Sequence, residues 1–163
     1  MNRGKGRRGF TLIEILVVIV ILTILVGIVV GAAKYAITKG QTSRAQAEIA
    51  TMEDALERYK SDNGAYPSSD IGSTTRALAV NNAVNDSISL YVALTTPKSY
   101  MTFKPNQLKT VGGVTYIVDP FGLPYNYYCH PSAGDQKNPV TFDLWSYGPD
   151  NTSDTGDDLT NWK

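Results

Sequence analysis

The sequence predicts an α+β protein in which one long N-terminal α-helix packs against a small antiparallel β-sheet. An apolar run over residues 10–30 continues, without a proline, into an amphipathic stripe, a pattern typical of one continuous helix. From residue 111 onward apolar and polar residues alternate instead, as in half-buried strands. We therefore divide the chain into a leader (1–9), a membrane helix (10–33), an amphipathic half of the same helix (34–62) and a globular head (63–163).

The apolar run from Phe10 to Val30 is long enough to cross a membrane. Its only charge is Glu14, and as a helix it spans about 32 Å, against a hydrocarbon core of about 30 Å. An ordinary secretory signal has a shorter apolar region, followed by a small-residue cleavage site. The residues before the run include four basic residues and no acid, so we expect the N-terminus in the cytoplasm and residues 34–163 outside it. These basic residues are Arg3, Lys5, Arg7 and Arg8.

The segment GFTLIE, residues 9–14, strongly resembles the processing signal of type IV pilins and type II secretion pseudopilins. In that family a membrane-embedded prepilin peptidase cuts after the glycine and methylates the new N-terminus. The resemblance implies cleavage between Gly9 and Phe10 and N-methylation of Phe10. It also implies a single-pass protein of the bacterial inner membrane that assembles into a helical filament.

Glu14 is unusual because an ionisable side chain inside a membrane segment costs about 2.5–3.5 kcal/mol and usually marks function. After cleavage, the α-amine of Phe10 is a cation at the same depth. We expect Glu14 of one subunit to pair with this amine on a neighbour during assembly. The alternative is a glutamate that only extends to the membrane interface from near the end of the helix.

Beyond Lys34, apolar residues recur at spacings of four and three, which predicts that the helix continues to about residue 60. The apolar stripe consists of Ala45, Ile49, Met52, Leu56 and Tyr59. The charged residues expected on the other faces are Arg44, Glu48, Glu53, Asp54, Glu57 and Arg58. The sequence Asp62-Asn63-Gly64 is expected to end the helix. Residues 58–67, with this turn and the Tyr66-Pro67 pair, resemble the segment that closes the long helix in the major pseudopilin subgroup.

The middle and the head are expected to contain short elements. One short helix is predicted at Thr75–Val84 and another at Ile88–Leu94, capped by Asp86 or Ser87 and ended by Pro97. Three strands are predicted, at 114–118, 125–129 and 140–145, with Gly112-Gly113 as a turn before the first. The first two are expected to form a hairpin around a longer loop. Residues 119–128, DPFGLPYNYY, again resemble the major pseudopilins.

The C-terminal stretch 146–162 is acidic, with four aspartates within nine residues. Calcium prefers six to eight carboxylate and carbonyl oxygens, so we expect this segment to fold back around one ion. It is not an EF-hand, because Thr155 stands where glycine is needed and no glutamate closes the loop. The alternative is a flexible, solvated acidic tail, although Leu159 and Trp162 argue against it.

The acidic stretch also resembles the calcium-binding loop of major pseudopilins. The resemblance implies Asp150 and Asp157 as side-chain ligands and the Tyr147 carbonyl as a backbone ligand. Asp158 is expected to contribute further and Asp154 more weakly. Without the basic leader the chain has 11 basic and 15 acidic residues, so we expect no nucleic-acid partner.

No catalytic centre is expected. Cys129 is the only cysteine and His130 the only histidine. Adjacent strand residues point to opposite faces, so these two do not form a nucleophile–base pair, and they are too few for a zinc site. Cys129 is expected to be a small buried side chain, the alternative being a reactive or cross-linking thiol.

The resemblance implies a structural subunit of the pseudopilus that drives type II protein secretion. Its expected partners are further copies of itself, the prepilin peptidase, minor pseudopilins, an inner-membrane platform and an assembly ATPase. One alternative is a type IV pilin of a surface filament for adhesion, motility or DNA uptake. Another is a membrane-anchored calcium-binding domain that never assembles and keeps its leader.

Overall fold

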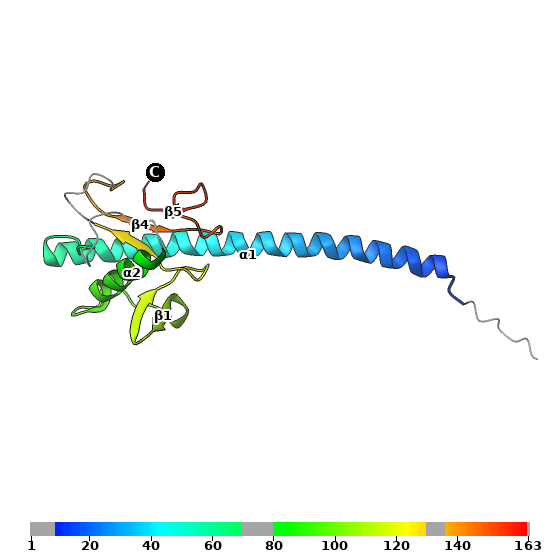
Figure 1. Cartoon of the computed structure of the whole chain (residues 1–163), viewed down its shortest axis with the longest axis horizontal. Helices are drawn as coiled ribbons and strands as arrows, with labels where there is room; N and C mark the ends of the chain where they lie inside the picture. Colours follow the sequence, from blue (N-terminus) through cyan, green and yellow to red (C-terminus); the bar gives the residue numbers. More distant parts are fainter. Residues whose placement is uncertain (1–8, 70–79, 130–135, 163) are drawn as a thin grey trace, which may run out of the picture. The chain divides into compact units, whose positions relative to one another are not determined.

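The computed structural model describes residues 9–69, 80–129 and 136–162 of the chain (Figure 1). The chain divides into two compact units, Met1–Lys39 and the head unit Gly40–Lys163. The elements in chain order are α1 (Leu12–Asn63), α2 (Val80–Thr95), the 3-10 turn η1 (Pro105–Gln107), β1 (Leu108–Val111), β2 (Val114–Ile117), β3 (Asn126–Tyr128), β4 (Asp143–Ser146) and β5 (Leu159–Thr160). The predicted α+β class is confirmed.

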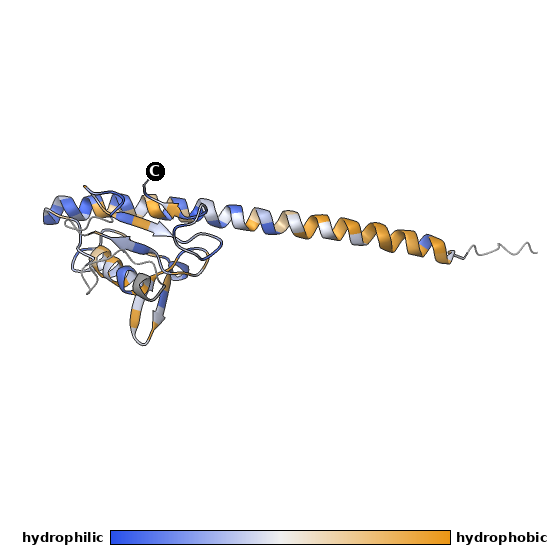
Figure 2. Ribbon diagram, turned by 45° about the horizontal axis from the view of Figure 1, so that its top comes forward, coloured by the Kyte–Doolittle hydropathy of each residue, from blue (hydrophilic) through white to orange (hydrophobic). Residues whose placement is uncertain are grey.

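The first unit consists of the N-terminal part of α1. Its large apolar side chains are exposed around the whole circumference, with at least 48% of each accessible between Phe10 and Val30. Figure 2 shows this part as almost continuously hydrophobic. α1 is the one helix in the described part of the chain that is long and apolar enough to cross a membrane. A soluble helix normally has one polar face, so this segment needs an apolar environment on every side.

In the head unit, α1 presents one apolar face to the core. Four of the five predicted stripe residues, Ala45, Ile49, Met52 and Leu56, are buried there, and Ala55 joins them. Glu48, expected on another face, is also buried. The placement of Glu48 was therefore wrong: it lies one turn from Ala45 and Met52, on the same side of the helix.

The predicted end of α1 is confirmed. The helix ends at Asn63, and Gly64 follows in the left-handed conformation with φ +82°. The Gly64 amide donates to the Lys60 carbonyl at 2.7 Å. Glycine is the usual residue at this position because a Cβ penalises positive φ.

The helix α2 differs from the prediction. It is one helix through Thr95, whereas the sequence predicted two short ones with a cap at Asp86 or Ser87. Residues 75–79 of the first predicted helix lie outside the described residues. The Ser87 hydroxyl donates to the Ile117 carbonyl at 2.7 Å and accepts from the Ile117 amide at 2.9 Å. Ser87 therefore attaches the middle of α2 to β2 instead of starting a helix.

The strands β1 and β2 form a two-stranded antiparallel hairpin that ends in a tight turn. Val111 pairs with Val114, and Gly112 and Gly113 between them have φ of +60° and +82°. Positive φ at both central residues defines a type I′ turn, which matches the strand twist. The predicted glycine turn is confirmed, whereas β1 was not predicted.

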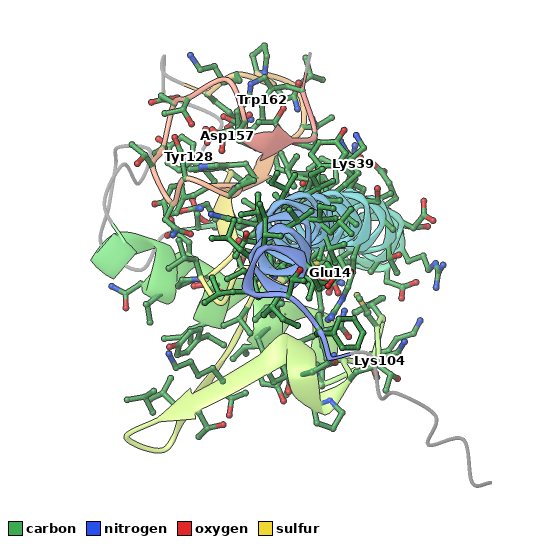
Figure 3. The ribbon with its side chains drawn as sticks, turned by 90° about the vertical axis from the view of Figure 1, so that its right-hand side faces the viewer. Glu14, Lys39, Lys104, Tyr128, Asp157 and Trp162 are labelled. Carbon is green, nitrogen blue, oxygen red and sulfur yellow. The ribbon has the colours of Figure 1, made fainter. Side chains whose placement is uncertain are left out.

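The second sheet has the order β3-β4-β5, antiparallel throughout. Every residue of β3 and β4 is buried. In Figures 1 and 3 β5 and the β1–β2 hairpin lie on opposite sides of the head part of α1. The predicted hairpin of 114–118 with 125–129 is only partly formed: β2 and β3 lie in separate sheets, joined by a single bridge between Val118 and Pro124.

The third predicted strand begins later than expected. β4 starts at Asp143, and Val140 is 86% exposed. The Asp143 carboxylate accepts hydrogen bonds from the amides of Lys137 and Asn138, at 2.7 and 2.8 Å. The Thr141 amide donates back to the Asn138 carbonyl. This local turn holds residues 137–141 out of the sheet, because their backbone groups are already paired.

Candidate functional site

The N-terminal candidate site lies where α1 begins. The backbone amide and the hydroxyl of Thr11 both donate to Glu14 Oε2, at 2.7 and 2.8 Å, and the Glu14 amide donates to Thr11 Oγ1 at 3.3 Å. This reciprocal arrangement is a capping box. The structure thus places the Glu14 carboxylate on its own helix end, a role that the T-x-x-E spacing signals but that was not predicted.

The predicted cleavage point precedes this cap. Gly9 and Phe10 lie before the first helical residue, and both are exposed. The bond between Gly9 and Phe10 is therefore not part of the helix. The basic residues Arg3, Lys5, Arg7 and Arg8 lie outside the described residues.

The second candidate site is the aspartate loop, which we define as residues 147–158 between β4 and β5. Ser146 and Leu159, on either side of the loop, are direct partners in the β4–β5 pairing. The chain therefore leaves the sheet and returns to the same place. All five metal-site residues predicted from sequence lie in this one closed loop: Tyr147, for its carbonyl, and the four aspartates Asp150, Asp154, Asp157 and Asp158.

Two aspartate carboxylates accept hydrogen bonds from backbone amides on the other side of the loop. The Asp150 amide donates to Asp157 Oδ2 at 3.0 Å, and the Asp154 amide donates to Asp158 Oδ2 at 2.8 Å. The Thr155 hydroxyl donates to Asp157 Oδ1 at 2.7 Å. This hydroxyl, followed by the Asp150 amide, lowers the pKa of Asp157. Burial raises the pKa of Asp158.

The backbone of the loop is tightly folded at Gly148. Gly148 has φ +69°, and a Cβ built on it would lie 2.2 Å from the Asp157 carbonyl oxygen. Asn151 and Asp154 also have positive φ, of 60° and 61°. Asparagine and aspartate tolerate this conformation better than other non-glycine residues. The loop sequence is thus suited to a compact backbone that brings Asp157 next to Gly148, at the start of the loop.

The ligand atoms that the four aspartates and the Tyr147 carbonyl offer to a metal are all oxygens, which suits a hard cation such as calcium. The loop brings Asp150 to Asp157 and Asp154 to Asp158. Within the described ranges, no group of three or more His, Cys, Asp or Glu residues is arranged to hold a metal. The Tyr147 side chain is buried in the head. Calcium ligation by these residues therefore stays a prediction.

The chain after the loop is anchored, so the alternative of a flexible acidic tail is wrong over residues 146–162. Leu159 is buried in β5, and the Trp162 ring packs edge-on against Trp145 with centroids 5.7 Å apart. The Asn161 side chain accepts from the Leu144 amide at 2.8 Å and donates to the Phe142 carbonyl at 3.1 Å. Figure 3 shows Asp157 and Trp162 on the same side of the head, around β5.

A buried polar network that sequence reasoning missed connects α1 to the strand region. The Tyr125 hydroxyl donates to Glu48 Oε2 at 2.8 Å, and Arg44 Nε donates to Glu48 Oε1 at 2.7 Å. Burial is the main cause that raises the pKa of Tyr125, and the Glu48 charge adds to it. Both carboxylate oxygens of Glu48 are therefore bonded, as a buried charge requires.

Asp119 is a second buried acid that was not predicted. Its Oδ1 accepts from the amides of Phe121 and Leu123, at 3.0 and 2.9 Å. Its Oδ2 accepts from the Ser146 hydroxyl at 2.6 Å. Burial raises the pKa of Asp119, and these hydrogen bonds act against that shift. The sequence signal that could have pointed to Asp119 is its place before Pro120, because an aspartate before proline is a frequent turn former.

Cys129 is buried, as expected, and its thiol donates to the Thr141 carbonyl at 3.4 Å. Burial is the main cause that raises the pKa of this thiol. A raised pKa lowers the thiolate fraction that a reactive cysteine needs. His130, the other residue considered for catalysis, lies outside the described residues.

Comparison with known proteins identifies the family. Residues 4–30 match the family model of the prokaryotic N-terminal methylation motif, and residues 34–98 match that of type II secretion system protein G.

Similar proteins include the type II secretion system core protein G of Pseudomonas aeruginosa, 37% identical over 97% of this chain and 96% of the relative. The core protein G of Escherichia coli K12 is 34% identical over 99% of this chain and 95% of the relative. The core protein G of Pectobacterium carotovorum is 33% identical over 98% of this chain and 86% of the relative. The resemblance to pseudopilins is confirmed, and the chain belongs to the type II secretion system protein G family.

Proposed function

We propose that this chain is the major structural subunit of a type II secretion pseudopilus and has no catalytic role of its own. The observation that carries the proposal is the N-terminal part of α1, which is apolar, exposed on all sides and included in the match to the methylation motif over residues 4–30. Such a helix requires lipid around it before assembly. In a filament, the same surface is covered by the helices of neighbouring copies.

The steps follow from the order of the residues along the chain. The basic leader holds the N-terminus in the cytoplasm, so the head unit reaches the extracytoplasmic side of the inner membrane. The prepilin peptidase then cuts between Gly9 and Phe10 and methylates Phe10. A cut at this bond places the new α-amine next to the Thr11–Glu14 capping box.

Glu14 then sets the position of one subunit against the next. In the structure its carboxylate bonds to Thr11 of the same chain. A carboxylate accepts more hydrogen bonds than these two, so a neighbour's α-amine can be added without breaking the cap. The assembly ATPase supplies the energy for adding subunits, and the inner-membrane platform positions them. Minor pseudopilins accompany the growing filament.

The proposal is tested by complementation of a type II secretion strain that lacks its own protein G. Expression of this chain together with its cognate membrane platform is expected to restore secretion, and overproduction to give short filaments visible by electron microscopy. A processed, membrane-inserted chain that forms long surface fibres without restoring secretion would favour a type IV pilin. One that never assembles would contradict both filament roles.

We further propose that the aspartate loop holds a structural calcium ion through Asp150 and Asp157. The Tyr147 carbonyl and Asp158 are expected to add ligands, with a weaker contribution from Asp154. The support is the closed backbone of the loop and the hydrogen bond that joins Asp157 to residue 150. A bound ion neutralises carboxylates that otherwise repel one another and so stabilises the head.

Thermal unfolding of the full chain in detergent, in calcium or in a chelator, tests this ion. An extracytoplasmic site binds at about 10⁻⁴–10⁻³ M, so 10 mM calcium, about 10- to 100-fold above that Kd, is expected to raise the unfolding temperature. Asp150→Ala should abolish this rise. Asp54→Ala, which removes an exposed aspartate of α1, should preserve it. Equal unfolding temperatures of the wild type in calcium and chelator would contradict the proposal.

A further inference from the structure

The carboxylate of Asp119 joins two parts of the head that lie far apart in sequence. It is 3% exposed, and its Oδ1 organises the turn of residues 119–123 by accepting from the Phe121 and Leu123 amides. Its Oδ2 accepts from the hydroxyl of Ser146, the last residue of β4. The two oxygens thus serve different segments.

The contact with Ser146 continues into the aspartate loop. Ser146 is fully buried, and its hydroxyl oxygen accepts from the Gly148 amide at 3.1 Å while its proton is donated to Asp119. Gly148 in turn lies against the Asp157 carbonyl. The position of residue 148, and through it that of Asp157, therefore depends on a serine whose orientation is set by Asp119.

The other side of the 119–123 turn contacts α1. The Pro120 carbonyl accepts a hydrogen bond from Gln41 Nε2 at 2.8 Å. Gln41 is the second residue of the head unit, which begins at Gly40. The turn organised by Asp119 is therefore bonded to the helix close to the residue where the head unit starts.

We propose that Asp119 is a positioning residue that couples the aspartate loop to the start of the head part of α1. Its Oδ2 orients Ser146 and the loop, and its Oδ1 shapes the turn that binds Gln41. A change that loosens the backbone of the loop consequently also loosens the backbone of the turn, and the reverse holds as well. The coupling requires no ion and goes beyond the proposed function, so it is tested in the ion-free protein.

Two variants separate this coupling from a general structural role. Asp119→Asn keeps an oxygen for the Phe121 and Leu123 amides but replaces the acceptor for Ser146 by an NH₂ group. Ser146→Ala removes the same contact from the other side. The matched control is Ser87→Ala: Ser87 is equally buried and also makes two hydrogen bonds, but to Ile117 in β2.

The measurement is hydrogen exchange, followed by mass spectrometry, on the full chain in detergent with a chelator. Both Asp119→Asn and Ser146→Ala are expected to raise exchange about tenfold in peptides covering 147–158 and 120–123, the effect of about one lost buried hydrogen bond. Because the two variants break one contact, the double variant should add nothing further. Ser87→Ala should leave the ratio of the exchange rates of these two peptides to the exchange rate of β3 unchanged.

Three results would overturn the proposal. The first is exchange that rises uniformly over the head in all three variants, which is what a merely structural role predicts. The second is a rise in 147–158 without one in 120–123. The third is complete unfolding of both test variants while Ser87→Ala stays folded, because the proposal limits their effect to the loop, the turn and the contact of the turn with Gln41.

Discussion

Gly148 and Asp157 are in direct backbone contact: a Cβ at position 148 would lie 2.2 Å from the Asp157 carbonyl oxygen and 2.9 Å from its carbonyl carbon. Gly148→Ala must therefore move the loop backbone and also holds alanine at positive φ. The strain of the dihedral alone costs about 1–3 kcal/mol. We expect the free energy of unfolding of the full chain in detergent to fall by at least that amount.

Gly156→Ala is the matched control in the same loop. Its Cβ would meet nothing within 4 Å, and Gly156 does not have positive φ. This variant should change the free energy of unfolding by no more than about 0.5 kcal/mol. If Gly148→Ala is as mild as Gly156→Ala, the close packing of the loop on Gly148 is wrong.

Tyr125→Phe removes the donor that satisfies Glu48 Oε2 inside the head. A buried acceptor left without its partner costs about 1–3 kcal/mol, so the denaturation midpoint should fall accordingly. Tyr66→Phe removes a comparable hydroxyl, but its acceptor Glu57 is exposed. That variant should cost at most about 1 kcal/mol. Equal losses would mean that Glu48 is hydrated in solution.

Asp86 makes the stability of the head depend on pH. Burial raises the pKa of this α2 carboxyl from its ordinary value of 3.8 to about 7. Between these values the folded protein keeps a proton that the unfolded chain releases, so the free energy of unfolding falls as the pH rises from about 4 to about 7. Asp86→Asn should match the wild type at pH 4 and exceed it by a few kcal/mol at pH 8. A difference that is constant with pH would contradict the burial of a titrating Asp86.

Glu14→Ala is expected to abolish filament assembly while membrane insertion and cleavage stay intact. The variant removes the only charged side chain of the apolar run and with it the proposed partner of a neighbour's α-amine. Thr23→Ala is the control, because the Thr23 hydroxyl donates to the Ile19 and Val20 carbonyls of its own helix. Sheared filament yield and electron microscopy give the result. Normal filaments from Glu14→Ala would remove Glu14 from the assembly mechanism.

Local signals in the sequence predicted the features that depend on local physics. The end of α1 at Asn63 follows from a glycine that takes positive φ, and the hairpin turn from two such glycines. The apolar stripe predicted most of the buried face because helical periodicity does not depend on the partner. The acidic loop was located from composition alone.

The remaining features depend on long-range contacts that no local pattern shows. Val140 alternates correctly with Phe142, yet the Asp143 carboxylate captures the preceding amides and delays β4. Glu48 is buried because a tyrosine 77 positions away supplies a hydrogen bond. Asp119 acquires its second contact from Ser146, 27 positions later. In each case a polar side chain is placed by a partner that sequence spacing does not identify.

Mass spectrometry of the N-terminal peptide from the membrane-bound chain tests the central claim most directly. The chain should be expressed with a prepilin peptidase, and its mature N-terminus should be Phe10 carrying one added methyl group. In a strain without the peptidase, the chain should retain residues 1–9. An intact leader in the presence of an active peptidase, or a cut at another position, would contradict the assignment of this chain as a processed pseudopilus subunit.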